Sequence, residues 1–201
     1  TYAIGMSHVG LKILYEVINA QQNLSAERVF APWVDMADLM RERGIPLFSL
    51  ENRRPVRDFD CVGFSMQFEL LCTNVLAMLE LAMIPLETSA RSDDDPIVIA
   101  GGPGAYNPEP MAAFIDAFVL GDGEEVVLEI AEVIRNSKGR PRQDRLKSLA
   151  QVEGIYVPSL YEVVQGADGS IESIRPAVPE APERVKRRVV RDLDSATYPT
   201  A

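Results

Sequence analysis

The residues best placed for chemistry are glycines that directly follow two short apolar runs. Residues 97–100 (Ile-Val-Ile-Ala) end at Gly101 and Gly102, and residues 117–120 (Ala-Phe-Val-Leu) end at Gly121. A continuous apolar run between turn residues is typical of a strand buried on both faces of a parallel sheet. Such sheets bind ligands beyond the carboxyl ends of their strands, where glycines let a large flat or phosphate-bearing ligand approach the backbone. The alternative is that these glycines only make tight turns.

Small and polar loops are expected at the same edge of the sheet. Residues 5–10 (Gly-Met-Ser-His-Val-Gly) and 65–67 (Ser-Met-Gln) each follow a predicted strand, and residues 121–124 (Gly-Asp-Gly-Glu) lie beside them. His8 is the only histidine of the chain, so it has no second histidine or nearby cysteine with which to hold zinc. Residues 101–104 (Gly-Gly-Pro-Gly) match neither the phosphate-binding P-loop nor the dinucleotide-binding pattern. These loops therefore predict a ligand cleft, with no catalytic residues and no metal site.

Strand and helix patterns alternate along the first part of the chain. Helical spacing of apolar residues predicts helices after residue 10, from residue 35 to residue 44, around residues 75–83 and after residue 124. Strands are predicted at residues 2–4, 28–31, 59–64, 97–100 and 117–120, with an edge strand at 46–50. Such alternation is typical of a parallel sheet with right-handed crossovers. We therefore expect a doubly wound α/β domain, flavodoxin-like or Rossmann-like, over residues 1–138.

The pattern changes after residue 138. Residues 139–201 are expected to form a connector with a short helix, then a small β appendage and a linker. Strands are predicted at residues 154–157, 160–164 and 171–174, with a Gly-Ala-Asp-Gly turn between the last two. Five basic residues lie among valines in residues 184–191. We interpret this segment as an exposed strand with charged edges, the alternative being a nucleic-acid contact.

Composition limits the class of protein. The chain has 201 residues, a formal net charge of −10 and 47% hydrophobic residues, which is ordinary for a soluble globular protein. The acidic balance argues against general nucleic-acid binding, which requires a basic surface. No apolar run is long enough for a membrane span and no secretory signal is present, so we expect a cytoplasmic location. Cys61 and Cys72 are too few for a disulfide framework and are expected to be buried free thiols.

Six short motifs follow one another along the chain: residues 5–11 (Gly-Met-Ser-His-Val-Gly-Leu), 30–33 (Phe-Ala-Pro-Trp), 63–65 (Gly-Phe-Ser), 100–103 (Ala-Gly-Gly-Pro), 107–110 (Asn-Pro-Glu-Pro) and 121–125 (Gly-Asp-Gly-Glu-Glu). In this order they resemble the amino-terminal region of the cobalamin-binding-domain radical SAM proteins, most closely a bacterial subgroup in which this region precedes the radical SAM core. Residues 154–159 (Gly-Ile-Tyr-Val-Pro-Ser) also resemble the segment that joins the two domains. The resemblance implies a cobalamin-binding-type α/β domain that presents a cofactor or substrate to a radical SAM core in the same polypeptide.

The resemblance also implies where a cofactor would lie. In the family, Asp-x-His-x-x-Gly follows the first strand and its histidine coordinates cobalt, while a later serine and a Gly-Gly pair accommodate the nucleotide tail. Aligning Gly10 with the last glycine of this pattern places Gly5 at the aspartate and Ser7 at the histidine. The implied cofactor-binding positions are Gly5, Ser7, Gly10, Ser65, Gly101, Gly102, Gly121 and Gly123. Any cobalamin bound there would lack the histidine ligand, because His8 is one position away.

Other chemistry of the family is not expected from this chain. The radical SAM core holds a four-iron–four-sulfur cluster through Cys-x-x-x-Cys-x-x-Cys and binds S-adenosylmethionine. Cys61 and Cys72 are too few and wrongly spaced for that motif. Both cofactors are therefore expected only in a core outside this chain, and the chain by itself is not expected to be catalytic.

Three functions are compatible with these features. The first is the cobalamin-binding-like domain of a radical SAM enzyme. The second is a degenerate docking domain of the same enzyme, which predicts a cleft filled by the protein's own Trp33, Met66, Phe68 or Tyr106. The third is a free-standing flavin or nucleotide binder, against which the missing phosphate-binding motifs count. RNA as the substrate of the whole enzyme has only residues 184–191 in its favour.

Overall fold

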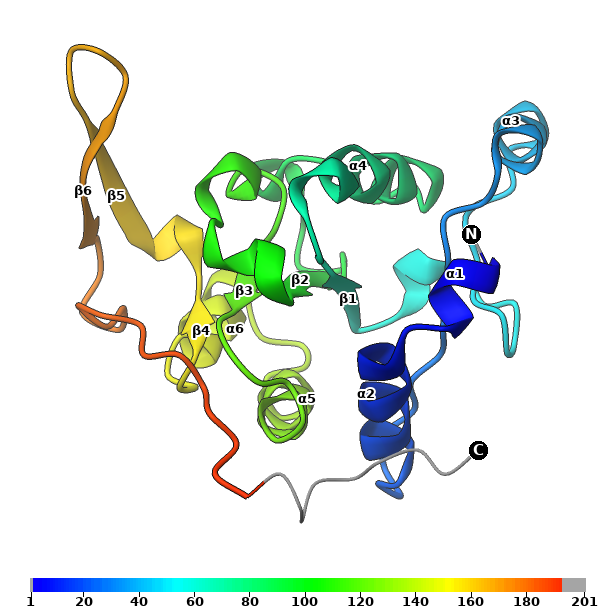
Figure 1. Ribbon diagram of the computed structural model, residues 1–201, viewed down its shortest axis with the longest axis horizontal. Helices are drawn as coiled ribbons and strands as arrows, with labels where there is room; N and C mark the ends of the chain where they lie inside the picture. Colours follow the sequence, from blue (N-terminus) through cyan, green and yellow to red (C-terminus); the bar gives the residue numbers. More distant parts are fainter. Residues whose placement is uncertain (1, 193–201) are drawn as a thin grey trace.

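A four-stranded sheet lies at the centre of the fold (Figure 1). The computed structural model describes residues 2–192. Strands β1 (Cys61–Ser65), β2 (Ile97–Gly101) and β3 (Ala117–Val119) are parallel neighbours in that order, and β4 (Ile155–Tyr156) continues the sheet antiparallel to β3. The prediction of an α/β fold with a mostly parallel sheet is confirmed.

Helices cover both faces of this sheet. α4 (Cys72–Leu81) lies on one face, while α5 (Val126–Asn136) and α6 (Arg142–Leu149) lie on the other (Figure 1). Successive side chains of a strand point to opposite faces, so Val98 packs in the apolar cluster under α4 and Ile97 in the cluster under α5 and α6. Both residues are fully buried, which explains why β2 reads as one continuous apolar run. The inward face of α5 carries branched residues four positions apart, namely Val126, Ile130 and Ile134.

The amino-terminal segment is helical, and the strand predicted at residues 2–4 is wrong. Helix α1 (Tyr2–Met6) occupies this segment and α2 (Val9–Asn19) follows it. His8 caps α2, because its Nδ1 accepts the backbone N–H of Leu11 at 3.0 Å. A helix satisfies its own backbone hydrogen bonds, whereas a strand needs a neighbour, so a short apolar run that lies apart from the sheet becomes helical.

Two further predicted strands do not join the sheet. The strand expected to begin at Arg28 has no regular structure, and the Arg28 N–H is instead bonded to the Glu51 carboxylate at 2.8 Å. A side chain therefore takes the place of a neighbouring strand. The edge strand predicted at residues 46–50 forms only one bridge, between Phe48 and Pro55. The N–H of Leu47, which would extend the ladder, donates instead to Leu81 O at 2.8 Å.

Helix α3 (Val34–Arg43) lies at the periphery of the fold (Figure 1). It ends at Gly44, as predicted, with Gly44 in the left-handed conformation at φ +62°. Its buried residues are Ala37 and Met40, so most of its surface is exposed.

The carboxyl-terminal part contains the predicted small β appendage, in which β5 (Tyr161–Gln165) pairs antiparallel with β6 (Ile171–Pro176). This hairpin projects from the main sheet (Figure 1). α6 and β4 lie beyond residue 138 and pack on the main sheet, while the division of the chain at residues 138 and 139 stays a prediction. Short 3-10 helices complete the connections: η1 (Val56–Asp58), η2 (Glu69–Leu71), η3 (Thr88–Ala90), η4 (Pro103–Tyr106), η5 (Glu109–Met111) and η6 (Pro158–Leu160).

Candidate functional site

The candidate site is the carboxyl edge of the sheet, where β1 and β2 end side by side. Ser65 is the register partner of Gly101, so the loops that follow them start together. The N–H of Met66 donates to the Gly101 carbonyl at 2.7 Å, and the N–H of Gly104 donates to the Met66 carbonyl at 2.8 Å. The side-chain amide of Gln67 donates to Ser65 Oγ at 2.8 Å. The two main-chain hydrogen bonds hold the loops together, and the side-chain bond between Gln67 and Ser65 lies within the loop after β1.

Gly102 is required by this contact between the loops. It has φ +95°, a conformation that residues with a Cβ rarely adopt. A Cβ placed on Gly102 would also lie 2.8 Å from the Met66 carbonyl oxygen. The glycine therefore allows two segments of the protein's own backbone to approach closely.

Gly121, at the end of β3, is covered by a segment from the far end of the chain. Its φ is +114°, and a Cβ there would lie 2.0 Å from the Arg188 carbonyl oxygen. Arg188 donates its N–H to Leu120 O at 2.7 Å and accepts the N–H of Asp122 at 3.1 Å. The exposed strand predicted over residues 184–191 is reduced to one parallel bridge between Gly121 and Arg188.

Three of the other implied cofactor positions, Gly5, Ser7 and Gly10, do not lie in a loop after a strand. Gly5 and Ser7 belong to α1 and the residue that follows it, and a Cβ on Gly5 would lie 2.2 Å from the Phe30 ring. Gly10 lies in the first turn of α2. Gly123 is closer to the sheet edge, where a Cβ would lie 3.1 Å from Leu14 of α2. The structure therefore brings Ser65, Gly101 and Gly102 together with Gly121 beside them, and places Gly5, Ser7 and Gly10 in the α1–α2 segment, which does not follow a strand.

These positions do not fit the cradle that cobalamin would need. The space beside Gly5, Gly102 and Gly121 is filled by Phe30, Met66 and Arg188 respectively. His8 Nδ1 is already the acceptor that caps α2. The glycines at this edge therefore allow other segments of the protein to approach the backbone closely. This agrees with the alternative that they only make tight turns.

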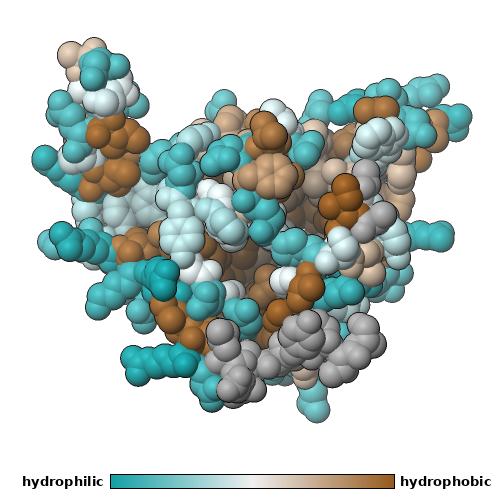
Figure 2. Space-filling model, in the orientation of Figure 1, coloured by the Kyte–Doolittle hydropathy of each residue, from teal (hydrophilic) through white to brown (hydrophobic). Residues whose placement is uncertain are grey.

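Large apolar side chains are exposed at the same edge. Phe68 is 50% exposed and Leu70 is 81% exposed in the loop after β1, and Tyr106 is 53% exposed in the loop after β2. Four side chains were expected to fill a cleft, and of these only Met66 is buried. Trp33 is 66% exposed, and Phe68 and Tyr106 are about half exposed. Figure 2 shows a hollow near the centre of one face with hydrophobic atoms at its base and other hydrophobic atoms exposed above it.

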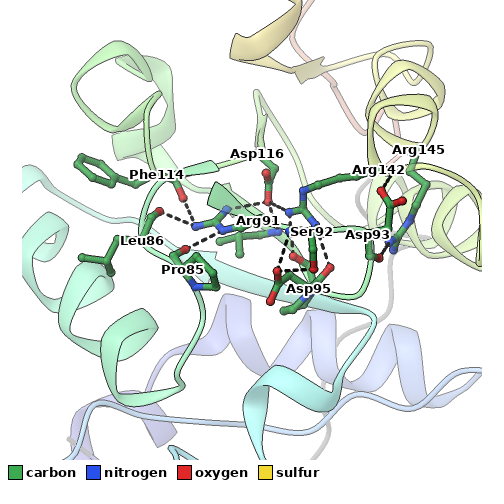
Figure 3. Close-up of polar contacts among 12 residues, drawn as sticks. Pro85, Leu86, Arg91, Ser92, Asp93, Asp95, Phe114, Asp116, Arg142 and Arg145 are labelled. Carbon is green, nitrogen blue, oxygen red and sulfur yellow. Dashed lines mark hydrogen bonds and ion pairs between the residues drawn. The ribbon is translucent and has the colours of Figure 1, made fainter. Parts of the chain in front are cut away.

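A buried ionic network lies at the opposite, amino-terminal edge of the strands (Figure 3). Asp116, just before β3, accepts hydrogen bonds from Arg91 at 2.8 Å, Arg142 at 2.6 Å and the Val98 N–H at 2.7 Å, all through Oδ2. The side chains of Asp116 and Arg91 are completely buried. Burial lowers the pKa of Arg91, and the charge of Asp116 opposes that effect.

This network has a structural role that the sequence did not indicate. Arg91 also donates to the carbonyl oxygens of Leu86 and Phe114, and Arg142, at the start of α6, donates to that of Pro96. The network thereby connects the amino-terminal ends of β2 and β3 to the start of α6. The signal in the sequence is weak, because the two arginines lie far along the chain from Asp116.

The described residues carry no group of three or more His, Cys, Asp and Glu side chains that could hold a metal ion. Cys61 and Cys72 are free and partly buried. Desolvation by burial, followed by the charge of Asp116, raises the pKa of the Cys61 thiol to about 12, so this thiol is a poor metal ligand. None of the helices within residues 2–192 is both long enough and apolar enough to cross a membrane.

The fold is thus an α/β domain in which the protein's own atoms occupy the space beside Gly102 and Gly121 at the carboxyl edge of the sheet. Comparison with protein families shows the class of protein to which such a domain belongs here. The family described as "Radical SAM proteins, N-terminal" matches residues 10–158, and this chain belongs to that family. The match includes all four strands of the main sheet. Searches of the curated proteins and of the solved structures gave no match.

Proposed function

We propose that this chain is the docking domain of a radical SAM enzyme and that it binds the radical SAM core of the same polypeptide. The contact is made by the docking edge, which we define as Phe68, Leu70 and Tyr106. The observation that carries the proposal is the exposure of these three large apolar side chains at one edge of the sheet. At this edge the protein's own atoms occupy the space beside Gly102 and Gly121. Membership of the amino-terminal family supports the radical SAM core as the partner.

The docking edge has the properties of a protein-binding surface. Exposed apolar groups rimmed by polar residues mark interaction sites, and aromatic side chains supply much of the binding energy at such sites. The hydrogen bonds of Met66 and Gly104 hold the two loops in fixed positions, so little ordering is required on binding. Because the core is proposed to be in the same polypeptide, a high effective concentration allows a modest surface to suffice.

In this proposal the chain contributes position rather than reacting groups. The four-iron–four-sulfur cluster and S-adenosylmethionine are held by the core, as the resemblance implies. The docking edge orients the core relative to the sheet and excludes water from the contact between them. This role requires no ionisable catalytic group on the docking edge.

Replacing Phe68 and Leu70 together with serine is expected to weaken binding to the core at least about tenfold, since two anchoring apolar groups are removed from the contact. The measurement is calorimetric titration of the 201-residue chain with the radical SAM core of the same protein, produced separately. Both side chains are at least half exposed, so circular dichroism and the melting temperature should stay unchanged.

The matched control is Ile171→Ser, which removes a 46% exposed apolar side chain from the hairpin and should leave the affinity unchanged. Equal affinity of the double variant and the unmodified chain would place the contact elsewhere. Absence of any binding between the unmodified chain and the core would overturn the docking proposal.

Cobalamin binding is the second candidate, favoured by Ser65, Gly101 and Gly102 lying together at one edge as the resemblance implies. We expect titration with hydroxocobalamin and methylcobalamin, followed by visible absorbance and calorimetry, to give no saturable binding. The reason is that the protein's own atoms occupy the space beside Gly5, Gly102 and Gly121, where the cofactor would approach the backbone. Saturable micromolar binding that Ser65→Ala weakens would replace the docking proposal. The Ser65 hydroxyl is hydrogen-bonded to the Gln67 side chain within the same loop, so its removal should leave the fold unchanged.

A further inference from the structure

Residues 188–190, which we call the latch, lie against the residues that follow β3 and are joined to them by a single bridge. Arg188 forms a parallel bridge with Gly121, and its main chain exchanges hydrogen bonds with Leu120 and Asp122. The N–H of Val190 donates to the Asp122 carboxylate at 2.9 Å, and the Val190 side chain is buried. The latch thus makes main-chain bonds of the kind that an extended peptide makes when it adds to a sheet edge.

The guanidinium of Arg188 lies between two carboxylates of one helix face. Its Nη2 is 3.0 Å from Glu125 Oε2 and 2.6 Å from Glu129 Oε1. Glu125 and Glu129 are four residues apart, so they project from the same side of α5. The hydrogen bond to Glu125, reinforced by that to Glu129, raises the pKa of Arg188. The pocket formed by these carboxylates therefore selects a cationic side chain.

Two glycines make room for the main chain of the latch. Gly121 and Gly154 both have positive φ, at +114° and +91°. A Cβ on Gly121 would lie 2.0 Å from the Arg188 carbonyl oxygen, and one on Gly154 would lie 3.1 Å from the Arg188 Cβ. A side chain on Gly121 would therefore block the main chain of the latch, and one on Gly154 would crowd it.

The contacts of the latch are few and partly exposed to water. The side chains of Glu125 and Glu129 are about half exposed, so salt screens their attraction to Arg188. Arg187 and Val189, on either side of Arg188, are exposed. Attachment in the same chain, at an effective concentration of about 1 mM, compensates for weak contacts.

We propose that the end of β3 is a binding groove for an extended, arginine-bearing peptide segment, and that the latch occupies it as an exchangeable ligand in cis. The groove consists of Gly121, Gly154, the Asp122 carboxylate and the pair Glu125 and Glu129. This inference is independent of the docking proposal, because the groove and the docking edge are formed by different residues.

The test uses a fluorescent peptide with the sequence of residues 184–191 and the full chain carrying Arg188→Glu, which repels Glu125 and Glu129 and vacates the groove. We expect this variant to bind the peptide with a Kd of about 100 μM or tighter, measured by fluorescence anisotropy. The unmodified chain should bind at least about tenfold more weakly, since its own latch competes at about 1 mM. A second variant, Val190→Asp, should also bind the peptide, because it removes the buried valine of the latch.

A peptide carrying Arg188→Ala should bind the Arg188→Glu chain at least about tenfold more weakly than the original peptide, because it loses both carboxylate contacts. The matched control peptide carries Arg187→Ala, which removes the same charge from a neighbouring exposed position and should keep its affinity. Equal losses for the two peptides would reduce the binding to general attraction between a basic peptide and an acidic protein. That result, or no saturation of either chain variant at about 1 mM peptide, would overturn the proposal.

Discussion

Asp116→Ala is expected to lower the free energy of unfolding by about 3 to 5 kcal/mol, because it leaves two buried arginines without their counter-charge. Arg91 and Arg142 both donate to Asp116 Oδ2. Without the carboxylate, each guanidinium keeps only neutral carbonyl oxygens as partners. The Val98 N–H at the start of β2 would lose its acceptor as well.

Urea unfolding followed by circular dichroism measures this effect. Asp38→Ala is the matched control, because Asp38 is 77% exposed and its contact with Arg41, at 3.3 Å, is on the surface. Surface pairs of this kind contribute about 0 to 1 kcal/mol, so the control should remain close to the unmodified chain. A loss below about 1 kcal/mol for Asp116→Ala would show that the network does not stabilise the connection of β2 and β3 to α6.

Gly102→Ala is expected to destabilise the protein by about 3 kcal/mol, through backbone strain and through collision with the loop after β1. The strain arises because φ is +95°, and the collision because the new Cβ would lie 2.8 Å from Met66 O. That oxygen accepts the Gly104 N–H, so moving it away also weakens the contact between the two loops.

Gly139→Ala separates the two causes. Gly139 has φ +79°, but a Cβ there would meet no atom within 4 Å. This control should therefore show only the strain, about 1 kcal/mol, in the same unfolding measurement. Equal losses for the two variants would mean that the loop after β1 moves freely, and that Gly102 is not needed for the close approach.

The central elements of this protein could be predicted from sequence because their pattern reflects local burial. Residues 97–100 and 117–120 are apolar at every position, which requires cover on both faces, and β2 and β3 are indeed buried on both. The apolar spacing after residue 124 predicted α5 for the same reason. The order of short motifs also indicated the radical SAM relationship, which the family match confirms at the level of the amino-terminal domain.

The amino-terminal strands were predicted wrongly because a strand depends on a neighbour that the local sequence does not specify. Residues 2–4 formed their hydrogen bonds within α1, and the Arg28 N–H bonded the Glu51 side chain, 23 residues away in the chain. Gly5 and Gly10 consequently lie in α1 and α2 with Ser7 between these helices, although the motif placed all three after a strand. Cobalamin binding and the cytoplasmic location remain predictions.

The sequence by itself determined the α/β class, the glycines at the ends of β2 and β3, and the family. Only the tertiary structure decided that those glycines meet the protein's own Met66 and Arg188, and that Asp116 gathers Arg91 and Arg142. The physical reason is the range of the interactions. Strand and helix patterns are set by neighbours within a few residues, whereas Gly121 and Arg188 meet only after the sheet and its helices have formed.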